Sequence, residues 1–184
     1  MKQLFHIIDG CYENDRQSQR SLYEQYYGYF LRVVFRYIDT YEEARRLTDH
    51  AFIVIFRNFS HFRPVLKNEP GFHLAAWMKG MVISAIIGEL KPKINLPLHD
   101  KLPNRLQEAA HLPPMETPTF YAEVIETIKG LPPGYRTVFN LHVIEGYSPI
   151  EIAKMLSMSE QTITLCIRIS REYCIKSLFT GAHL

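Results

Sequence analysis

The stretch EGYSPIEIAKMLSMSEQTITLCIRISREY, from Glu145 to Tyr173, decides the fold of the C-terminal part of the chain. Ser148 and Glu151 have the spacing of a capping box, and Pro149 occupies the first helical position, where its missing N–H costs nothing. The sequence therefore predicts a short helix that begins directly after Ser148. Its apolar residues fall on one face, and the alanine among them is small enough for a second helix to cross close by. These residues are Ile152, Ala153 and Leu156.

A second helix is predicted after a turn at Ser157 and Met158, with Met158 pointing inward. Ser159 can cap this helix, and Glu160 places an acidic side chain in its first turn. A narrow buried stripe is expected at steps of four, three and four residues, formed by Ile163, Ile167, Ser170 and Cys174. Two helices joined in this way form a helix-turn-helix.

The opposite face of the second helix carries residue types that read bases in the major groove of DNA. Gln pairs with adenine, Arg pairs with guanine, and Thr or Leu contacts a thymine methyl group. These side chains are Gln161, Thr164, Leu165 and Arg168. The segment alone leaves two interpretations open, a DNA-binding motif and an ordinary helical hairpin, because such capping and spacing occur in many helix pairs.

The composition is typical of a globular protein, with 184 residues, of which 47% are hydrophobic and 22% charged. The three cysteines, Cys11, Cys166 and Cys174, form no CxxC pair, so we expect a reducing cytoplasm and no disulfide framework. The N-terminal residues lack the apolar run and cleavage site of a secretion signal, and no stretch approaches the ~20 apolar residues of a membrane span. The sequence therefore predicts a soluble protein with no membrane partner.

Prolines divide the chain, since six of the eleven lie between residues 92 and 118. The sequence predicts an all-helical fold, because apolar residues recur at helical spacing and strand signals are almost absent. Residues 1–91 form one helical domain, residues 92–118 form a flexible Pro-rich linker, and residues 119–184 form a smaller helical domain that ends in the helix-turn-helix. Within the last domain, helices are expected over Phe120–Ile128 and Tyr135–Val143. Proteases are expected to cut in the linker first.

The charge balance argues against strong DNA binding by the C-terminal domain alone. Lys and Arg number 12 against 10 Asp and Glu in residues 1–91, 3 against 3 in residues 92–118, and 6 against 6 in residues 119–184. Most affinity for duplex DNA comes from neutralisation of phosphates by Lys and Arg. A domain without net charge should therefore bind weakly and with a shallow salt dependence.

Catalysis has little support in the sequence. The eight histidines are scattered, with no HExxH spacing and no Cys/His pair at zinc spacing, and no glycine-rich loop could hold a phosphate. We therefore expect no enzyme, no catalytic residue, no metal site and no cofactor.

Several longer motifs point to one family. The most specific is GLPPGYRTVFNLHVIEGYS, from Gly130 to Ser148, and fainter ones lie at Ser21–Tyr26, Glu42–Phe52 and Phe72–Trp77. Together they resemble the extracytoplasmic-function (ECF) sigma factors of the sigma-70 family, with the first motif similar to region 4 and the others to region 2. The resemblance spans nearly the whole chain. It implies a non-catalytic factor that binds core RNA polymerase, recognises promoter DNA and helps to separate the strands.

The resemblance places a polymerase-docking surface on the helix around residues 42–50, where this chain departs from the family. Acidic and amide residues are usual in the family at the positions of Arg45, Arg46 and His50. Like charges that face each other across an interface can cost several kcal/mol, so docking relies on the remaining acids or on a partner that has changed too. The candidate polymerase-binding residues are Glu42, Glu43, Arg45, Arg46, Asp49 and His50.

The strand-separating segment of the family also differs here. Arg, Asn, Asp and a basic tail are usual, whereas this chain has Gly80, Ile83, Ser84 and Gly88 before Lys91. Little remains of the cationic groove and stacking platforms that hold a single strand. Trp77 is retained, and we expect it in the core beside Leu74, Met81 and Val82.

The recognition helix has lost basic residues as well. Gln161, Thr164, Leu165, Cys166 and Ile169 stand where the family usually has Gly, Lys, Ser, Arg and further basic residues, and the basic residues that remain are Arg168 and Arg171. Weak or relaxed promoter reading is therefore expected. The candidate DNA-binding residues are Gln161, Thr164, Leu165, Arg168, Arg171 and Lys91.

Two accounts remain open. The first is a sigma factor, and the second is a sigma-like adaptor that does not initiate from promoters by itself; both hold if another complex delivers the protein to DNA. The expected partners are core RNA polymerase and promoter or target DNA, and the resemblance also allows an anti-sigma factor or a DNA-targeting complex. Tyr135, Phe139 and Leu141 could serve either as core residues or as polymerase contacts.

Overall fold

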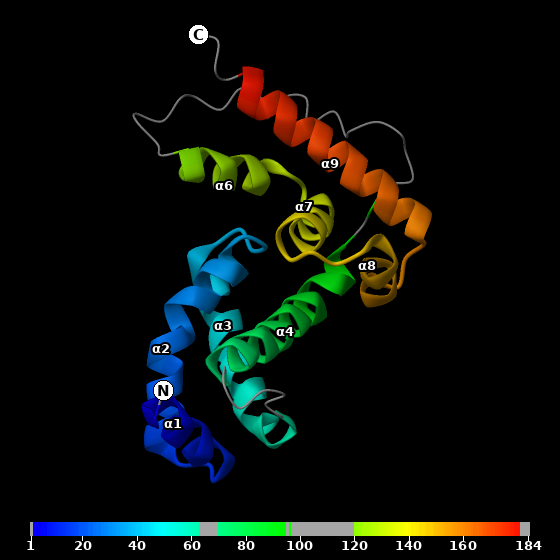
Figure 1. The fold of residues 1–184 in the computed structure, drawn as a ribbon. Helices are drawn as coiled ribbons and strands as arrows, with labels where there is room; N and C mark the ends of the chain where they lie inside the picture. The colour runs from blue at the N-terminus through cyan, green and yellow to red at the C-terminus, as the bar shows by residue number, and fades with distance from the viewer. Residues whose placement is uncertain (1, 63–69, 95, 97–119, 181–184) are drawn as a thin grey trace. The chain divides into compact units, whose positions relative to one another are not determined.

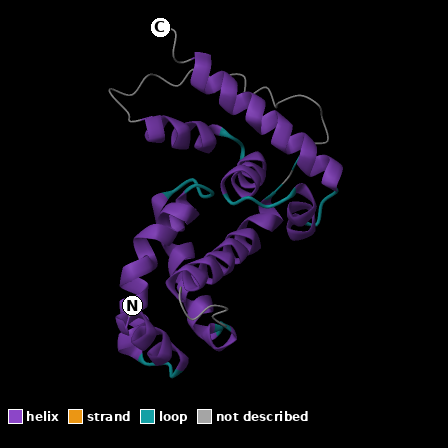
Figure 2. Ribbon diagram, in the orientation of Figure 1, coloured by secondary structure: helices purple, strands orange, loops and turns teal. Residues whose placement is uncertain are grey.

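The computed structural model of the chain describes residues 2–62, 70–94, 96 and 120–180, and most of the predicted linker lies outside these ranges (Figure 1). Within them every regular element is a helix, which confirms the predicted all-helical fold (Figure 2). Contacts between Cα atoms divide the chain into two compact units, Met1–Glu89 and Leu90–Leu184.

The N-terminal unit is a set of helices that pack on one another. Helix α1 packs on α2, α2 packs on α3, and the short η1 contacts both α1 and α3. Their bounds are α1 Lys2–Tyr12, α2 Arg16–Phe35, α3 Tyr41–Arg57, the 3-10 helix η1 Phe59–His61, and α4 Pro70–Leu90.

Side-chain caps define the starts of two helices in this unit. The Asp15 carboxylate accepts a hydrogen bond from the Ser18 N–H at 2.7 Å at the start of α2. At the start of α3, Thr40 Oγ1 accepts from the Glu43 N–H at 3.2 Å and donates to the Glu43 carboxylate at 3.0 Å. Each cap satisfies an N–H group that has no partner within its helix.

The core of the N-terminal unit is rich in aromatic rings. Phe30 and Phe52 are fully buried and meet edge to face, with ring centroids 5.9 Å apart. Trp77 is half-buried and packs against Phe59 and Phe62, with centroid separations of 5.7 and 5.3 Å. Trp77 is therefore part of an aromatic cluster.

The C-terminal unit is built around its last helix. Helices α6, α7 and α8 each pack on α9, and α7 and α8 both adjoin a π-helical turn, η3. The bounds are η2 Lys91–Lys93, α6 Phe120–Gly130, α7 Pro133–Phe139, η3 Asn140–Ile144, α8 Pro149–Leu156 and α9 Glu160–Thr180.

A buried arginine fixes the junction of α6 and α7. The Arg136 guanidinium donates hydrogen bonds to the carbonyl of Lys129 at 2.7 Å and to the carbonyl of Leu131 at 3.0 and 3.2 Å. These carbonyls lie at the C-terminal end of α6, where helical partners are lacking and a cation is favoured by the helix dipole. Gly130 leaves room for α9, because a Cβ atom there would lie 2.6 Å from Tyr173 Oη.

The C-terminal unit also includes residues that precede α6. We define residues 90–94 and 96 as the strap. Leu96 is buried, and a Cβ atom on Gly134 of α7 would lie 2.7 Å from Leu96 Cδ2 and 3.3 Å from Ile94 Cγ2. The strap therefore packs on α7, although residues 92–96 fall within the segment that the proline content marks as a linker.

Candidate nucleic-acid interface

The predicted capping box is present at the start of α8. The Ser148 N–H donates to Glu151 Oε2 at 2.8 Å, and the Glu151 N–H donates to Ser148 Oγ at 3.3 Å. The Ser148 hydroxyl also donates to Glu151 Oε2 at 2.7 Å. Hydrogen bonds from the Ser148 side chain and backbone lower the pKa of the Glu151 carboxyl. The first helix of the motif therefore starts where the sequence indicates.

The turn between α8 and α9 has the geometry of a tight helix end. Ser157 adopts a left-handed conformation with φ of 56°, and the Met158 N–H donates to the Ala153 carbonyl at 3.0 Å. Met158 is half-buried. Ser159 then caps α9, since the Thr162 N–H donates to Ser159 Oγ at 3.1 Å. The predicted turn and second cap are both confirmed.

The buried stripe of α9 is wider than the sequence indicates. The four predicted residues, Ile163, Ile167, Ser170 and Cys174, are all buried. Cys166 and Ile169, which stand where the resemblance implies basic residues, are also buried, with only 1% and 2% of their surfaces exposed. The reason is that α6, α7 and α8 all pack against α9 and together cover more than one narrow stripe.

The remaining candidate residues of α9 form a face open to solvent. Gln161, Thr164, Arg168 and Arg171 are exposed, and Leu165 is half-buried. One guanidinium is already engaged, because Arg168 Nη1 lies 3.5 Å from the Glu172 carboxylate one turn along the helix. A DNA phosphate would have to compete with this ion pair.

Lys91 directly follows α4, the helix that carries Gly80, Ile83, Ser84 and Gly88. It belongs to η2 of the strap, and its ammonium group donates a hydrogen bond to Ser157 Oγ at 2.7 Å. Ser157 forms the turn of the helix-turn-helix. Lys91 therefore lies beside the C-terminal motif.

The candidate polymerase-binding residues on α3 are largely engaged within the N-terminal unit. Arg46 Nη2 lies 3.3 Å from the Glu89 carboxylate of α4. Arg45 Nη1 lies 3.9 Å from the Glu42 carboxylate, and Glu43 takes part in the cap of α3. These pairs are exposed and individually weak, but they reduce the charge that α3 presents to a partner.

Asp49 is engaged as well. The Tyr23 hydroxyl donates to Asp49 Oδ1 at 2.8 Å. Burial raises the pKa of Tyr23, and the hydrogen bond to Asp49 and its negative charge raise the pKa further. The phenol therefore stays protonated and keeps Asp49 directed towards α2.

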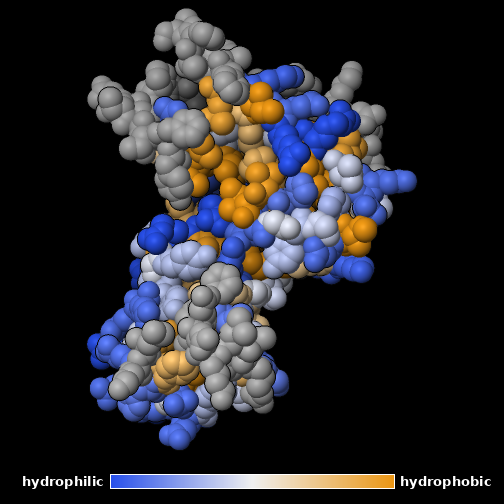
Figure 3. All heavy atoms as spheres, in the orientation of Figure 1, coloured by the Kyte–Doolittle hydropathy of each residue, from blue (hydrophilic) through white to orange (hydrophobic). Residues whose placement is uncertain are grey.

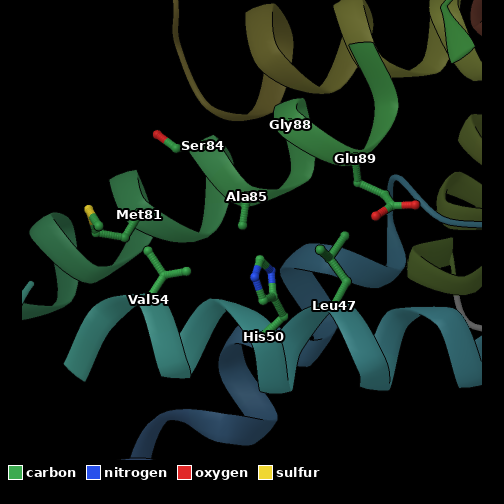
Figure 4. A pocket seen from close by; sticks show the side chains of 8 residues that line it. All are labelled: Leu47, His50, Val54, Met81, Ser84, Ala85, Gly88 and Glu89. Carbon is green, nitrogen blue, oxygen red and sulfur yellow. The ribbon is translucent and has the colours of Figure 1, made fainter. Parts of the chain in front are cut away.

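His50 borders a groove between α3 and α4 with a volume of 430 Å³ (Figure 4). Its imidazole points from α3 towards Ala85 of α4. The groove is mainly apolar, and its lining residues are Leu47, His50, Val54, Met81, Ser84, Ala85, Gly88 and Glu89. His50 thus faces the neighbouring helix α4.

Exposed apolar residues of the C-terminal unit were not identified from the sequence. Tyr135, Phe139 and Leu141 are buried, so they are core residues. Large apolar side chains that are exposed in this unit include Val143, Ile144, Ile150 and Ile175, and Figure 3 shows apolar surface over the C-terminal helices. Val143 and Ile144 end the π-helical turn, which no simple spacing rule would have revealed.

A metal-binding cluster and a membrane-spanning helix are both absent from the described ranges. Residues 2–62, 70–94, 96 and 120–180 contain no group of three or more His, Cys, Asp or Glu side chains that could hold a metal ion. In the same ranges, no helix combines the length and apolar character needed to cross a bilayer.

The comparison with protein families identifies the helix-turn-helix segment. Residues 121–164 match the model of the sigma-70 family described as region 4. The match covers nearly all of α6, then α7, η3, α8 and the first turn of α9, with Gln161 and Thr164 inside it and Arg168 beyond its end. A search of curated proteins gives no significant match. The C-terminal unit thus contains a sequence similar to sigma-70 region 4, which indicates a sigma-factor-like role in DNA binding.

Proposed function

We propose that the chain is an ECF-type sigma factor that binds core RNA polymerase and directs it to DNA, with weak promoter reading of its own. The observation that carries this proposal is the doubly capped helix-turn-helix within the residues that match region 4. Its exposed face presents Gln161, Thr164 and Arg168, which suit base edges in the major groove. The factor has no catalytic role and acts in the cytoplasm, where polymerase and DNA are present.

Weak promoter reading follows from the charges of the recognition helix. Arg168 is paired with Glu172, and Glu160 places a negative charge in the first turn of α9. With 6 basic and 6 acidic residues in residues 119–184, few phosphates can be neutralised. A DNA-targeting partner would then supply the position on DNA that the protein does not find alone.

We assign two surfaces to the polymerase. The first is the exposed face of α3 that carries Arg45 and Arg46. The second is the apolar surface of Val143, Ile144 and Ile150 in the C-terminal unit, which are between 41% and 50% exposed. Exposed apolar groups near the end of one helix and the start of the next are suited to a protein partner.

The adaptor function is the second candidate, and the pairing on α3 favours it. Arg46 binds Glu89, Arg45 lies beside Glu42, and Asp49 accepts from Tyr23, so few charges of this face are left for docking. A protein that keeps only the C-terminal surface could still hold one partner of a larger complex.

A pull-down with purified core RNA polymerase tests the proposal. The wild-type chain is expected to bind, and Ile150→Ser is expected to weaken binding because it removes exposed apolar surface from the assigned contact. Ile175→Ser is the matched control, since Ile175 is equally apolar and 56% exposed but lies on the C-terminal half of α9. No binding by the wild-type chain would favour the adaptor. Equal losses in both variants would remove the assigned apolar contact.

A further inference from the structure

We propose that Lys91 is a phosphate contact of the helix-turn-helix, delivered to duplex DNA by the strap. This inference rests on the proposed function, because it concerns how the same motif binds DNA. The family resemblance would place Lys91 at the end of a segment that handles single strands. In the structure Lys91 follows α4 directly, and its ammonium group lies 2.7 Å from Ser157 Oγ, in the turn that precedes α9.

The strap packs at a defined position on α7 within the C-terminal unit. Leu96 is buried, and Gly134 leaves the space that Leu96 and Ile94 occupy. The Ile94 N–H also donates to the Leu90 carbonyl at 3.1 Å, which closes the turn around Lys91. A short segment fixed at both ends holds a lysine with less loss of conformational entropy on binding than a free chain.

The position of Lys91 suits a phosphate beside the major groove. When a helix-turn-helix docks, the N-terminal part of the second helix enters the groove, and the first helix crosses the sugar-phosphate backbone. The turn that joins the two helices therefore lies near the backbone. Lys154, which is exposed in the last turn of α8, adds a second positive charge close to this turn in sequence.

Lys91 would supply charge that the family-matched segment lacks. The basic and acidic residues are balanced in residues 119–184, and Glu160 opposes phosphate at the start of α9. Lys91 and Lys93 of the strap are both exposed and add two cations to this balanced module. The helix-turn-helix thus gains a phosphate contact from a residue 66 positions away from Ser157 in sequence.

The test is the salt dependence of binding of the full-length chain to a short fluorescent duplex, with a single strand of the same sequence as comparison. Lys91→Ala is expected to lower the magnitude of the slope of log K against log salt by about 1 for the duplex, and not for the single strand. Lys176→Ala is the charge-matched control. Lys176 lies on α9 about 25 Å along the helix from Ser159, far from the turn that Lys91 contacts. This variant is expected to leave the slope unchanged.

Ser157→Gly tests the role of the hydrogen bond. Glycine fits the left-handed conformation of Ser157, so the turn should keep its shape while the acceptor for Lys91 is lost. The variant is expected to weaken duplex binding in the wild-type background and to have no further effect when combined with Lys91→Ala. Additive losses would contradict a joint role.

Other outcomes separate this inference from the proposed function. Equal losses in Lys91→Ala and Lys176→Ala, or equal losses for duplex and single strand, would overturn the phosphate contact. Arg168→Ala should weaken duplex binding whatever Lys91 does. If Arg168→Ala matters and Lys91→Ala does not, only the inference about Lys91 is wrong. If neither matters, the DNA-binding role of the motif is wrong as well.

Discussion

Leu96 fills the space that Gly134 leaves open, since a Cβ atom at position 134 would lie 2.7 Å from Leu96 Cδ2. This relationship attaches the strap to α7 and brings Lys91 to the turn of the helix-turn-helix. The absence of a side chain on Gly134 of α7 therefore allows the strap to hold the ammonium group of Lys91 beside Ser157.

Gly134→Ala is expected to destabilise the protein when Leu96 is present. The added methyl group collides with Leu96, and such overpacking lowers the free energy of unfolding by about 1–3 kcal/mol. This cost opposes a gain of about 1 kcal/mol in helix propensity. In a Leu96→Ala background the contacts with the Leu96 side chain are gone and the one with Ile94 Cγ2 at 3.3 Å remains, so the same change should cost much less. Urea denaturation followed by circular dichroism measures both effects. Gly88→Ala on α4 is the control, because a Cβ atom there meets nothing within 4 Å and should not destabilise. An equal loss of stability in both backgrounds would contradict the packing.

Ser148→Ala is expected to lower the free energy of unfolding by about 1 kcal/mol, because it removes the cap of α8. The measurement is the midpoint of chemical denaturation, together with affinity for duplex DNA. Ser84→Ala is a suitable control, since Ser84 is exposed within α4 and donates to the Gly80 carbonyl without capping a helix start. A loss in Ser84→Ala as large as that in Ser148→Ala would show that the cap is not responsible.

Glu151 gives a pH dependence with a defined sign. Its folded-state pKa lies below the ordinary value of 4.5, chiefly because of hydrogen bonds from Ser148. The ionised carboxylate therefore stabilises the fold above pH 4.5, and this contribution is lost as the pH falls through the lowered pKa. The stability difference between wild type and Glu151→Gln should be largest near neutral pH and shrink in acid. It should show less pH dependence in a Ser148→Ala background; an unchanged profile there would exclude the capping box as the cause.

Arg45→Glu is expected to raise affinity for core RNA polymerase by about two- to fivefold, the value of one exposed charge pair. Affinity should rise because Arg45 stands on the assigned α3 surface at a position where the resemblance implies an acidic or amide residue. Arg57→Glu makes the same charge change at the end of the same helix and should have a smaller effect. Lower affinity of Arg45→Glu would mean that the polymerase surface is acidic at this point.

Features that depend on neighbours in sequence could be predicted. The capping box of Ser148 and Glu151 and the cap at Ser159 follow from three-residue spacings, and both are present. The stripe of Ile163, Ile167, Ser170 and Cys174 follows from helical periodicity, and all four residues are buried.

Features that depend on several elements at once could not be predicted. Cys166 and Ile169 are buried because three helices cover α9, and helical spacing cannot tell how many neighbours a helix has. Arg136 looks like a surface cation in sequence, yet it is 4% exposed because the carbonyls at the end of α6 need donors. The pairing of Lys91 with Ser157 joins residues far apart in the chain and left no local signal.

Transcription in vitro with core RNA polymerase and this protein alone tests the central claim most directly. Polymerase is expected to bind the protein but to initiate poorly from any defined promoter. The reason is that the exposed face of Gln161, Thr164 and Arg168 belongs to residues 119–184, in which basic and acidic residues are balanced. Addition of a partner that tethers the protein to a chosen DNA site should then raise initiation at that site. Efficient and selective initiation by polymerase and this protein without a partner would contradict the account.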